Sequence, residues 1–309
     1  MRRVRARLAR TMRPPEIALE AHGVRLHGIA WPGPASPFSL LLHATSFCAD
    51  VWLPAWEAAQ SAAARPLRAV AVDARGHGRS GRAEGEGAYA WTRGVEDVIA
   101  WLEALAPEIE GGALLVGHSS GATVALAVAA LRPELVRGVA LIEPVLFETP
   151  ADRSRGDSFL GSRVMAERAR KRRADFASTR DARERLLQRF PYAGFASAAF
   201  EAFLAGGLAG VPGGGVRLRC APEVEAAWYE GAAALDLWPL LAGLRAPALL
   251  IAAEHGAMPA TLLERLRAAL PAGRLERVPG TTHFAALEAP ERVGALIGGF
   301  ASALAGGAP

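Results

Sequence analysis

The pentapeptide Gly-His-Ser-Ser-Gly at residues 117–121 constrains the fold of this chain more than any other feature. An apolar run at residues 113–116 predicts a buried strand before it, and an alanine-rich run at 122–131 predicts a helix after it. A strand that turns at once into a helix forces its corner residue into a strained conformation, with glycines where strand and helix approach closely. The pattern is typical of a nucleophile elbow with Ser119 at the corner.

Strand-like and helix-like segments alternate along most of the chain. After an opening hairpin over residues 17–31, short apolar strands are predicted at 39–43, 67–72, 113–116, 139–142, 248–251 and 274–278. Helices are predicted between them, at 53–63, 91–105, 122–131, 259–269 and 290–304. Short apolar strands separated by amphipathic helices predict an α/β fold, in which a mostly parallel sheet carries helices on both faces.

Residues 146–238 break this alternation. The segment has a charged, helical pattern to about Phe190 and is then rich in glycine, alanine and aromatic residues. We interpret it as a mainly helical cap, inserted between the core segments 16–145 and 239–309 and preceded by a basic tail at 1–15. Its aromatic residues either line a pocket or form the core of the cap; they are Phe159, Phe176, Phe190, Tyr192, Phe195, Phe200, Phe203, Trp228 and Tyr229.

Composition excludes several classes of protein. With 309 residues, of which 51% are hydrophobic, the chain can bury a large core. The longest apolar run is far shorter than the ~20 residues of a membrane span, so we expect a cytoplasmic protein without one. A net charge of +4 is too modest to indicate nucleic-acid binding. Cys48 and Cys220 show neither metal-ligand nor redox spacing, and we expect no metal or cofactor.

The densest cluster of basic residues lies in the predicted cap, at 163–173. Acidic residues, among them Glu167 and Asp175, are interspersed with it on a predicted helix. This mixture favours a solvated helix face, with an anion-binding site as the alternative.

Three further motifs accompany the pentapeptide, at 41–45 (Leu-Leu-His-Ala-Thr), 73–80 (Asp-Ala-Arg-Gly-His-Gly-Arg-Ser) and 278–284 (Val-Pro-Gly-Thr-Thr-His-Phe). With these motifs in this order, residues 16–304 resemble the α/β-hydrolase superfamily, whose oxyanion loop, D-x-R-G-H-G-x-S turn and catalytic-histidine loop they are similar to. The resemblance implies the α/β-hydrolase fold with an inserted cap, and the chemistry of a serine esterase or lipase.

The resemblance assigns roles to individual residues. A serine hydroxyl needs a base to take its proton, and His283 is the candidate base for Ser119. The backbone N–H groups of Thr45 and Ser120 are implied as donors to the oxyanion. We interpret the other histidines near these motifs as structural; they are His43, His77 and His118.

Two positions depart from the family pattern. Ala44 replaces the glycine that usually follows the loop histidine, which restricts the backbone there. Gly256 stands where the catalytic Asp is expected, so another carboxylate must orient His283. Glu143 is the candidate acid, because it follows the strand after the nucleophile helix, where the haloalkane dehalogenase branch places its acid. Glu254 is the reserve candidate, and a structural role for Glu143 is the alternative.

Ser119 excludes the route of haloalkane dehalogenases and epoxide hydrolases, which use an Asp at the elbow. The chain is therefore predicted to be a serine hydrolase that cleaves a carboxylic ester of a small to medium apolar substrate through a Ser119 acyl-enzyme. Lactonase, thioesterase, carbon–carbon bond hydrolase and cofactor-free perhydrolase activities stay open. A non-catalytic small-molecule-binding protein is the alternative from another class, suggested by Gly256.

Overall fold

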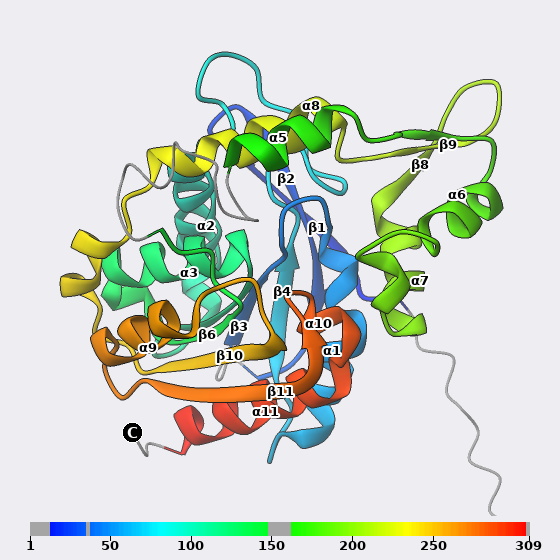
Figure 1. The fold of residues 1–309 in the computed structure, drawn as a ribbon. Coiled ribbons are helices and arrows are strands. Elements are labelled where there is room, and N and C mark those ends of the chain that lie inside the picture. Colours follow the sequence, from blue (N-terminus) through cyan, green and yellow to red (C-terminus); the bar gives the residue numbers. More distant parts are fainter. Residues whose placement is uncertain (1–12, 35–37, 148–161, 307–309) are drawn as a thin grey trace, which may run out of the picture.

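The computed structural model of the protein describes residues 13–34, 38–147 and 162–306. Its centre is an eight-stranded sheet (Figure 1) with the spatial order β1 (Glu16–Ala21), β2 (Val24–Trp31), β4 (Arg68–Val72), β3 (Phe38–Leu42), β5 (Ala113–His118), β6 (Val136–Ile142), β10 (Ala248–His255) and β11 (Arg274–Thr282). The pairs β1/β2 and β2/β4 are antiparallel, and every later pair is parallel. The predicted mostly parallel sheet is confirmed.

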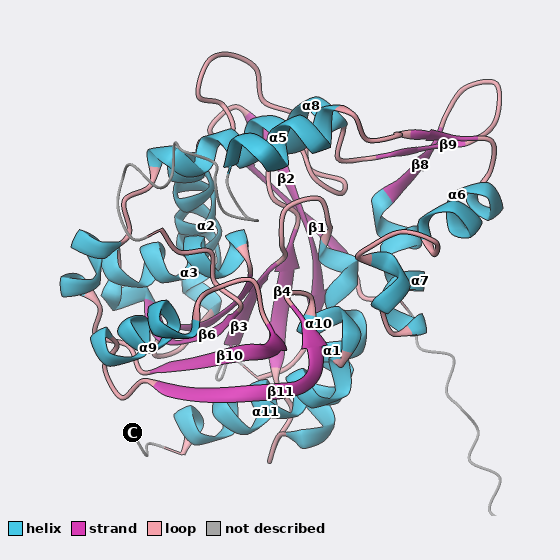
Figure 2. Ribbon diagram, in the orientation of Figure 1, coloured by secondary structure: helices cyan, strands magenta, loops and turns pink. Residues whose placement is uncertain are grey.

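Helices cover both faces of this sheet (Figure 2). The core helices are α1 (Leu53–Ala62), α2 (Trp91–Leu105), α3 (Ser120–Leu131), α9 (Ala260–Ala269), α10 (Ala285–Glu288) and α11 (Pro290–Ala305). Successive residues of a strand point to opposite faces, so both faces of a central strand are buried. In β5, Leu115 packs in the core that includes α2 and α3, whereas Leu114 and Val116 pack in the core that includes α1 and α11.

Between β6 and β10 the described chain forms α5 (Ser162–Arg170), β7 (Asp175–Phe176), α6 (Thr179–Leu186), α7 (Ser197–Gly207), β8 (Leu208–Gly210), β9 (Val216–Leu218) and α8 (Pro222–Glu230). We call residues 162–238 the cap. Strands β7, β9 and β8 form a small antiparallel sheet that sequence analysis missed, because strands of two or three residues carry no readable periodicity. A turn at 212–215, with the sequence Pro-Gly-Gly-Gly, joins β8 to β9.

The predicted basic tail, 1–15, lies largely outside the described residues. Arg13, near its end, is tied to the core by an ion pair of 2.7 Å with the buried carboxylate of Asp50. Cys48 and Cys220 are free, buried thiols. Among the described helices, none combines the length and the hydropathy needed to cross a membrane.

Two glycines let α11 pack directly on the backbone of α1. A Cβ added to Gly294 would lie 2.2 Å from the carbonyl oxygen of Ala55, and one added to Gly298 would lie 2.3 Å from that of Ala59. Gly299, the next residue, is exposed and has nothing within 4 Å of its hypothetical Cβ. A methyl group therefore has room at position 299 and has none at position 298.

We predict opposite effects of alanine at these neighbouring positions. Gly298→Ala should lower the free energy of unfolding by about 1–3 kcal/mol, because α11 must move away from α1. Gly299→Ala should raise it by about 0.5–1 kcal/mol, because alanine is the better helix former. Urea unfolding of the two variants beside the parent checks both signs, and equal effects would contradict the packing described here.

Candidate active site

Ser119 occupies the corner between β5 and α3. Its backbone has φ 56° and ψ −120°, a conformation that costs about 1–3 kcal/mol for a residue with a side chain. Its N–H donates to the carbonyl of Ile142 at 2.9 Å. A Cβ on Gly117 would lie 2.4 Å from the carbonyl oxygen of Gly121, and a Cβ on Gly121 would lie 2.5 Å from that of Leu42. The two glycines thus permit the strand–helix approach that fixes Ser119.

His283 lies directly beside Ser119 although 163 residues separate them in sequence. It follows the last strand, β11, and its Nε2 is 2.9 Å from Ser119 Oγ. Both side chains are almost fully buried, with relative exposures of 5% and 7% for the residues. Glu288 fixes the start of this loop by accepting hydrogen bonds from the backbone N–H and the hydroxyl of Thr282, both at 2.6 Å. Sequence analysis did not identify Glu288.

Glu143 is fully buried behind His283. Its Oε2 is 3.3 Å from His283 Nδ1, at the long end of hydrogen-bond geometry. Its two oxygens also accept backbone N–H groups, from Ala253 at 2.8 Å and from Ala257 at 3.1 Å. An ionised carboxylate only accepts, so a hydrogen bond to ionised Glu143 requires the hydrogen on Nδ1 of His283 and leaves Nε2 to accept from Ser119.

The glycine at the expected Asp position makes room for this carboxylate. A Cβ on Gly256 would lie 2.5 Å from Glu143 Oε1, so a side chain at 256 would displace the Glu143 carboxylate from this position. Glu254, the reserve candidate, is exposed and accepts the backbone N–H of Gly280 at 2.6 Å. Glu143 therefore contacts His283, whereas Glu254 contacts the backbone of Gly280.

Thr45 and Ser120 lie together, on the side of Ser119 away from His283. The Thr45 N–H and hydroxyl both donate to Ser120 Oγ, at 3.1 Å and 3.0 Å. Ser120 is the first residue of α3, where backbone N–H groups have no partner within the helix and the helix dipole is positive. Donors that suit an oxyanion are thus placed next to the nucleophile candidate.

The histidines interpreted as structural are buried and hydrogen-bonded. His43 accepts the N–H of Ala74 at 3.0 Å, and its other ring nitrogen is 2.8 Å from the carbonyl of Ala44. His77 and His118 contact the carbonyls of Arg75 and His283, at 3.0 Å and 2.8 Å. In the described part of the chain, no group of three or more His, Cys, Asp or Glu side chains is arranged to hold a metal.

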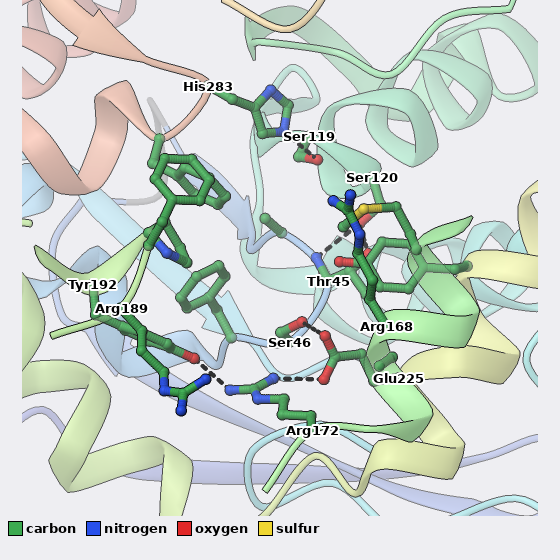
Figure 3. A pocket seen from close by; sticks show the side chains of 18 of the residues that line it. Thr45, Ser46, Ser119, Ser120, Arg168, Arg172, Arg189, Tyr192, Glu225 and His283 are labelled. Atoms are coloured by element: carbon green, nitrogen blue, oxygen red, sulfur yellow. Dashed lines mark hydrogen bonds and ion pairs between the residues drawn. The ribbon is translucent and has the colours of Figure 1, made fainter. Parts of the chain in front are cut away.

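A cavity of about 660 Å³ opens between the cap and this site (Figure 3). Ser119 and His283 form part of its wall. Of the aromatic residues that sequence analysis singled out, the lining includes Phe176, Phe190, Tyr192 and Tyr229. Those buried outside the lining are Phe195, Phe200, Phe203 and Trp228, and Phe159 lies outside the described residues.

A buried ionic network links the cap to the loop that carries Thr45. Glu225 of α8 accepts a hydrogen bond of 2.5 Å from the Ser46 hydroxyl and another of 2.5 Å from Arg172, which also donates to the Tyr192 hydroxyl. Ser46 has φ 78°, in the left-handed region that only glycine adopts easily. The cap therefore helps to hold the residue after Thr45 in a strained conformation. No motif in the sequence indicated this network.

The basic cluster at 163–173 is divided between the surface and the cavity. Arg163 and Arg170 are exposed and lie outside the cavity lining, as a solvated face requires. The lining instead includes Arg168, Lys171, Arg172 and Arg173. Arg168, Lys171 and Arg173 are exposed, as predicted for a solvated face, and also line the cavity, whereas Arg172 is half-buried.

Comparison with known proteins places the chain among hydrolases. A model described as the alpha/beta hydrolase family matches residues 40–296. Epoxide hydrolase B of Mycobacterium tuberculosis is 33% identical over 123 residues, a match that spans 39% of this chain and only 33% of that protein. A 2-(acetamidomethylene)succinate hydrolase of Mesorhizobium japonicum is 28% identical over 237 residues, which cover 72% of this chain and 74% of that protein.

Solved structures show the same fold. The crystal structure of E-2-(acetamidomethylene)succinate hydrolase superposes with a TM-score of 0.77 at 23% identity, covering 93% of this chain and 98% of that one. A thioesterase domain from the curacin biosynthetic pathway gives 0.70 at 23% identity, covering 92% of this chain and 98% of that one. The likeness at this identity concerns the fold alone.

We predict that the buried histidines make the protein less stable in acid. Burial lowers the pKa of both His77 and His118 from 6.5 to about 3, so the unfolded chain binds protons that the folded protein excludes. Their stabilising contribution is complete above about pH 6.5 and is lost as the pH falls toward 3. Between pH 7 and 5 the free energy of unfolding should fall by about 2 kcal/mol per histidine.

Denaturant titrations at the two pH values measure this loss. His77→Gln should reduce the pH dependence, whereas the matched change at the exposed His255 should leave it as in the parent. A parent protein equally stable at both pH values would refute the prediction.

Proposed function

Because the chain belongs to the alpha/beta hydrolase family, we propose that it is a serine hydrolase that cleaves a carboxylic ester or related acyl bond through an acyl-enzyme on Ser119. One observation carries the proposal. Ser119 Oγ, His283 and Glu143 form a continuous buried chain, with contacts of 2.9 Å and 3.3 Å. This is the order of nucleophile, base and orienting acid that acyl transfer requires.

In the proposed reaction Ser119 Oγ attacks the acyl carbon while His283 Nε2 takes its proton. Glu143 holds the Nδ1–H of His283 and stabilises the imidazolium that forms. His283 then gives the proton to the leaving group, and the same base activates the water that hydrolyses the acyl-enzyme. The long contact of 3.3 Å between His283 and Glu143 is compatible with this role, because such contacts tighten when substrate is bound.

The developing oxyanion is proposed to accept the backbone N–H groups of Ser120 and Thr45. The Thr45 N–H is directed at Ser120 Oγ in the free protein, so the oxyanion must replace or share that acceptor. Ser120 at the start of α3 adds the positive end of the helix dipole.

Two features separate this proposal from its alternatives. Ser119 in place of Asp argues against the alkyl-ester chemistry of epoxide hydrolases, although a relative carries that name. The buried Ser119–His283 pair argues against a non-catalytic binding protein, which needs no nucleophile and base in contact. Relatives in fold named as a succinate-derivative hydrolase and a thioesterase agree with acyl transfer on this scaffold.

Labelling with a fluorophosphonate tests the nucleophile. We expect one covalent adduct per chain, seen by intact mass, because His283 activates the Ser119 hydroxyl. Ser119→Ala should abolish the adduct, and the matched change at the exposed Ser61 should leave it. The proposal would be wrong if the adduct still formed in Ser119→Ala, or if the folded parent protein formed no adduct.

Isosteric substitution of the two candidate acids tests the triad. Glu143→Gln should lower kcat by about ten-thousand-fold, because the amide no longer holds His283 in its reactive tautomer. Glu254→Gln should retain nearly full turnover, since the exposed Glu254 contacts only the loop backbone at Gly280. Circular dichroism confirms that both variants fold. The reverse pattern of activity would assign the acid to Glu254.

A further inference from the structure

The wall that the cap contributes to the cavity is strongly basic. Glu225 is the only carboxylate among the described residues of the lining, whereas six basic side chains line it: Arg168, Lys171, Arg172, Arg173, Arg185 and Arg189. The whole chain carries a net charge of only +4. Positive charge is therefore concentrated around the cavity that holds Ser119, where low-dielectric walls strengthen its attraction for anions.

Part of this charge is neutralised within the cap. Arg172 forms an ion pair of 2.5 Å with Glu225. Arg173 and Arg185 both approach Asp181, at 3.8 Å and 2.6 Å. These three guanidinium groups therefore have structural partners.

Arg168 and Arg189 differ from these three. Within residues 13–34, 38–147 and 162–306, neither guanidinium has a hydrogen-bond or ion-pair partner, and the ammonium group of Lys171 has none either. Figure 3 shows the Arg168 side chain extending from α5 toward Ser120, and Arg189 on the opposite wall beside Tyr192. Each guanidinium thus keeps its N–H donors for a ligand in the cavity.

We propose that Arg168 binds a carboxylate of the substrate, with Arg189 on the opposite wall adding to the attraction for the anion; the substrate is then an acyl compound carrying a carboxylate besides its scissile bond. This inference rests on the proposed function, because it names the substrate class of the same site. The planar fork of a guanidinium matches a carboxylate with two parallel hydrogen bonds. The aromatic part of the lining, which includes Phe176 and Phe190, receives the hydrocarbon portion. The apolar substrate expected from the sequence thereby gains an anionic group.

Two nitrophenyl esters with acyl chains of equal length test the proposal. para-Nitrophenyl hydrogen succinate ends in a carboxylate where para-nitrophenyl butyrate ends in a methyl group. We expect kcat/KM to be higher for the succinate ester by about tenfold or more, since hydrogen bonds to charged groups are the strong ones. Arg168→Gln should reduce this ratio by about tenfold, and adding Arg189→Gln should abolish the preference.

Arg163→Gln is the matched control. It removes the same charge from the same helix, and both arginines are exposed, but only Arg168 lines the cavity, so the ratio of the two kcat/KM values should stay as in the parent. Equal kcat/KM for the two esters in the parent, or an unchanged ratio in Arg168→Gln, would overturn the proposal.

A binding measurement separates this proposal from the proposed function. Calorimetric titration of Ser119→Ala with succinate reports on the anion site without turnover, and adding Arg168→Gln should weaken binding about tenfold. If succinate binds in this way while neither ester is hydrolysed, the carboxylate site stands and the hydrolase proposal fails. If both esters are hydrolysed without preference and succinate does not bind, the carboxylate site fails and the hydrolase proposal stands.

Discussion

The close packing of β5 against α3 is the constraint on which the rest of the site depends. Gly117 lets the backbone of β5 lie against α3, Gly121 lets α3 lie against the end of β3, and Ser119 stands at this corner with φ 56°. The strain at this corner is stabilised by the two buried cores on either side of the sheet. With this corner fixed, the first N–H groups of α3 and the loop after β11 both lie beside Ser119.

The position of the carboxylate follows from the order of the strands. Strands β6 and β10 are parallel neighbours, so residues after either strand reach the same edge of the sheet. Glu143 fills that place from β6, and a Cβ on Gly256 after β10 would lie 2.5 Å from its Oε1. Gly256 therefore leaves the Glu143 carboxylate the space that a side chain at 256 would disturb. Glu143, which follows the neighbouring strand β6, thus accounts for the missing Asp at position 256.

The cap does more than cover the cavity. Its ion pair between Glu225 and Arg172 is buried, and such a pair is stable only when its other hydrogen bonds are also made. Ser46 and Tyr192 supply those bonds, which joins the cap to the loop beside Thr45. The same cap carries the basic residues of the cavity wall, so the shape of the loop at Thr45 and the charge around the cavity both depend on how the cap packs.

The sequence by itself determined the alternating strands and helices, the elbow at Ser119 and the candidates His283 and Glu143, because local periodicity and short motifs encode these features. It left the choice between Glu143 and Glu254 open, and for the basic cluster it favoured a solvated face with an anion-binding site as the alternative. Only the tertiary structure decided that Glu143 contacts His283 at 3.3 Å, that Glu225 reaches Ser46, and that Arg168 faces the cavity. The first two contacts join residues 140 and 179 positions apart, and their formation depends on strand order and cap packing, which no local pattern records.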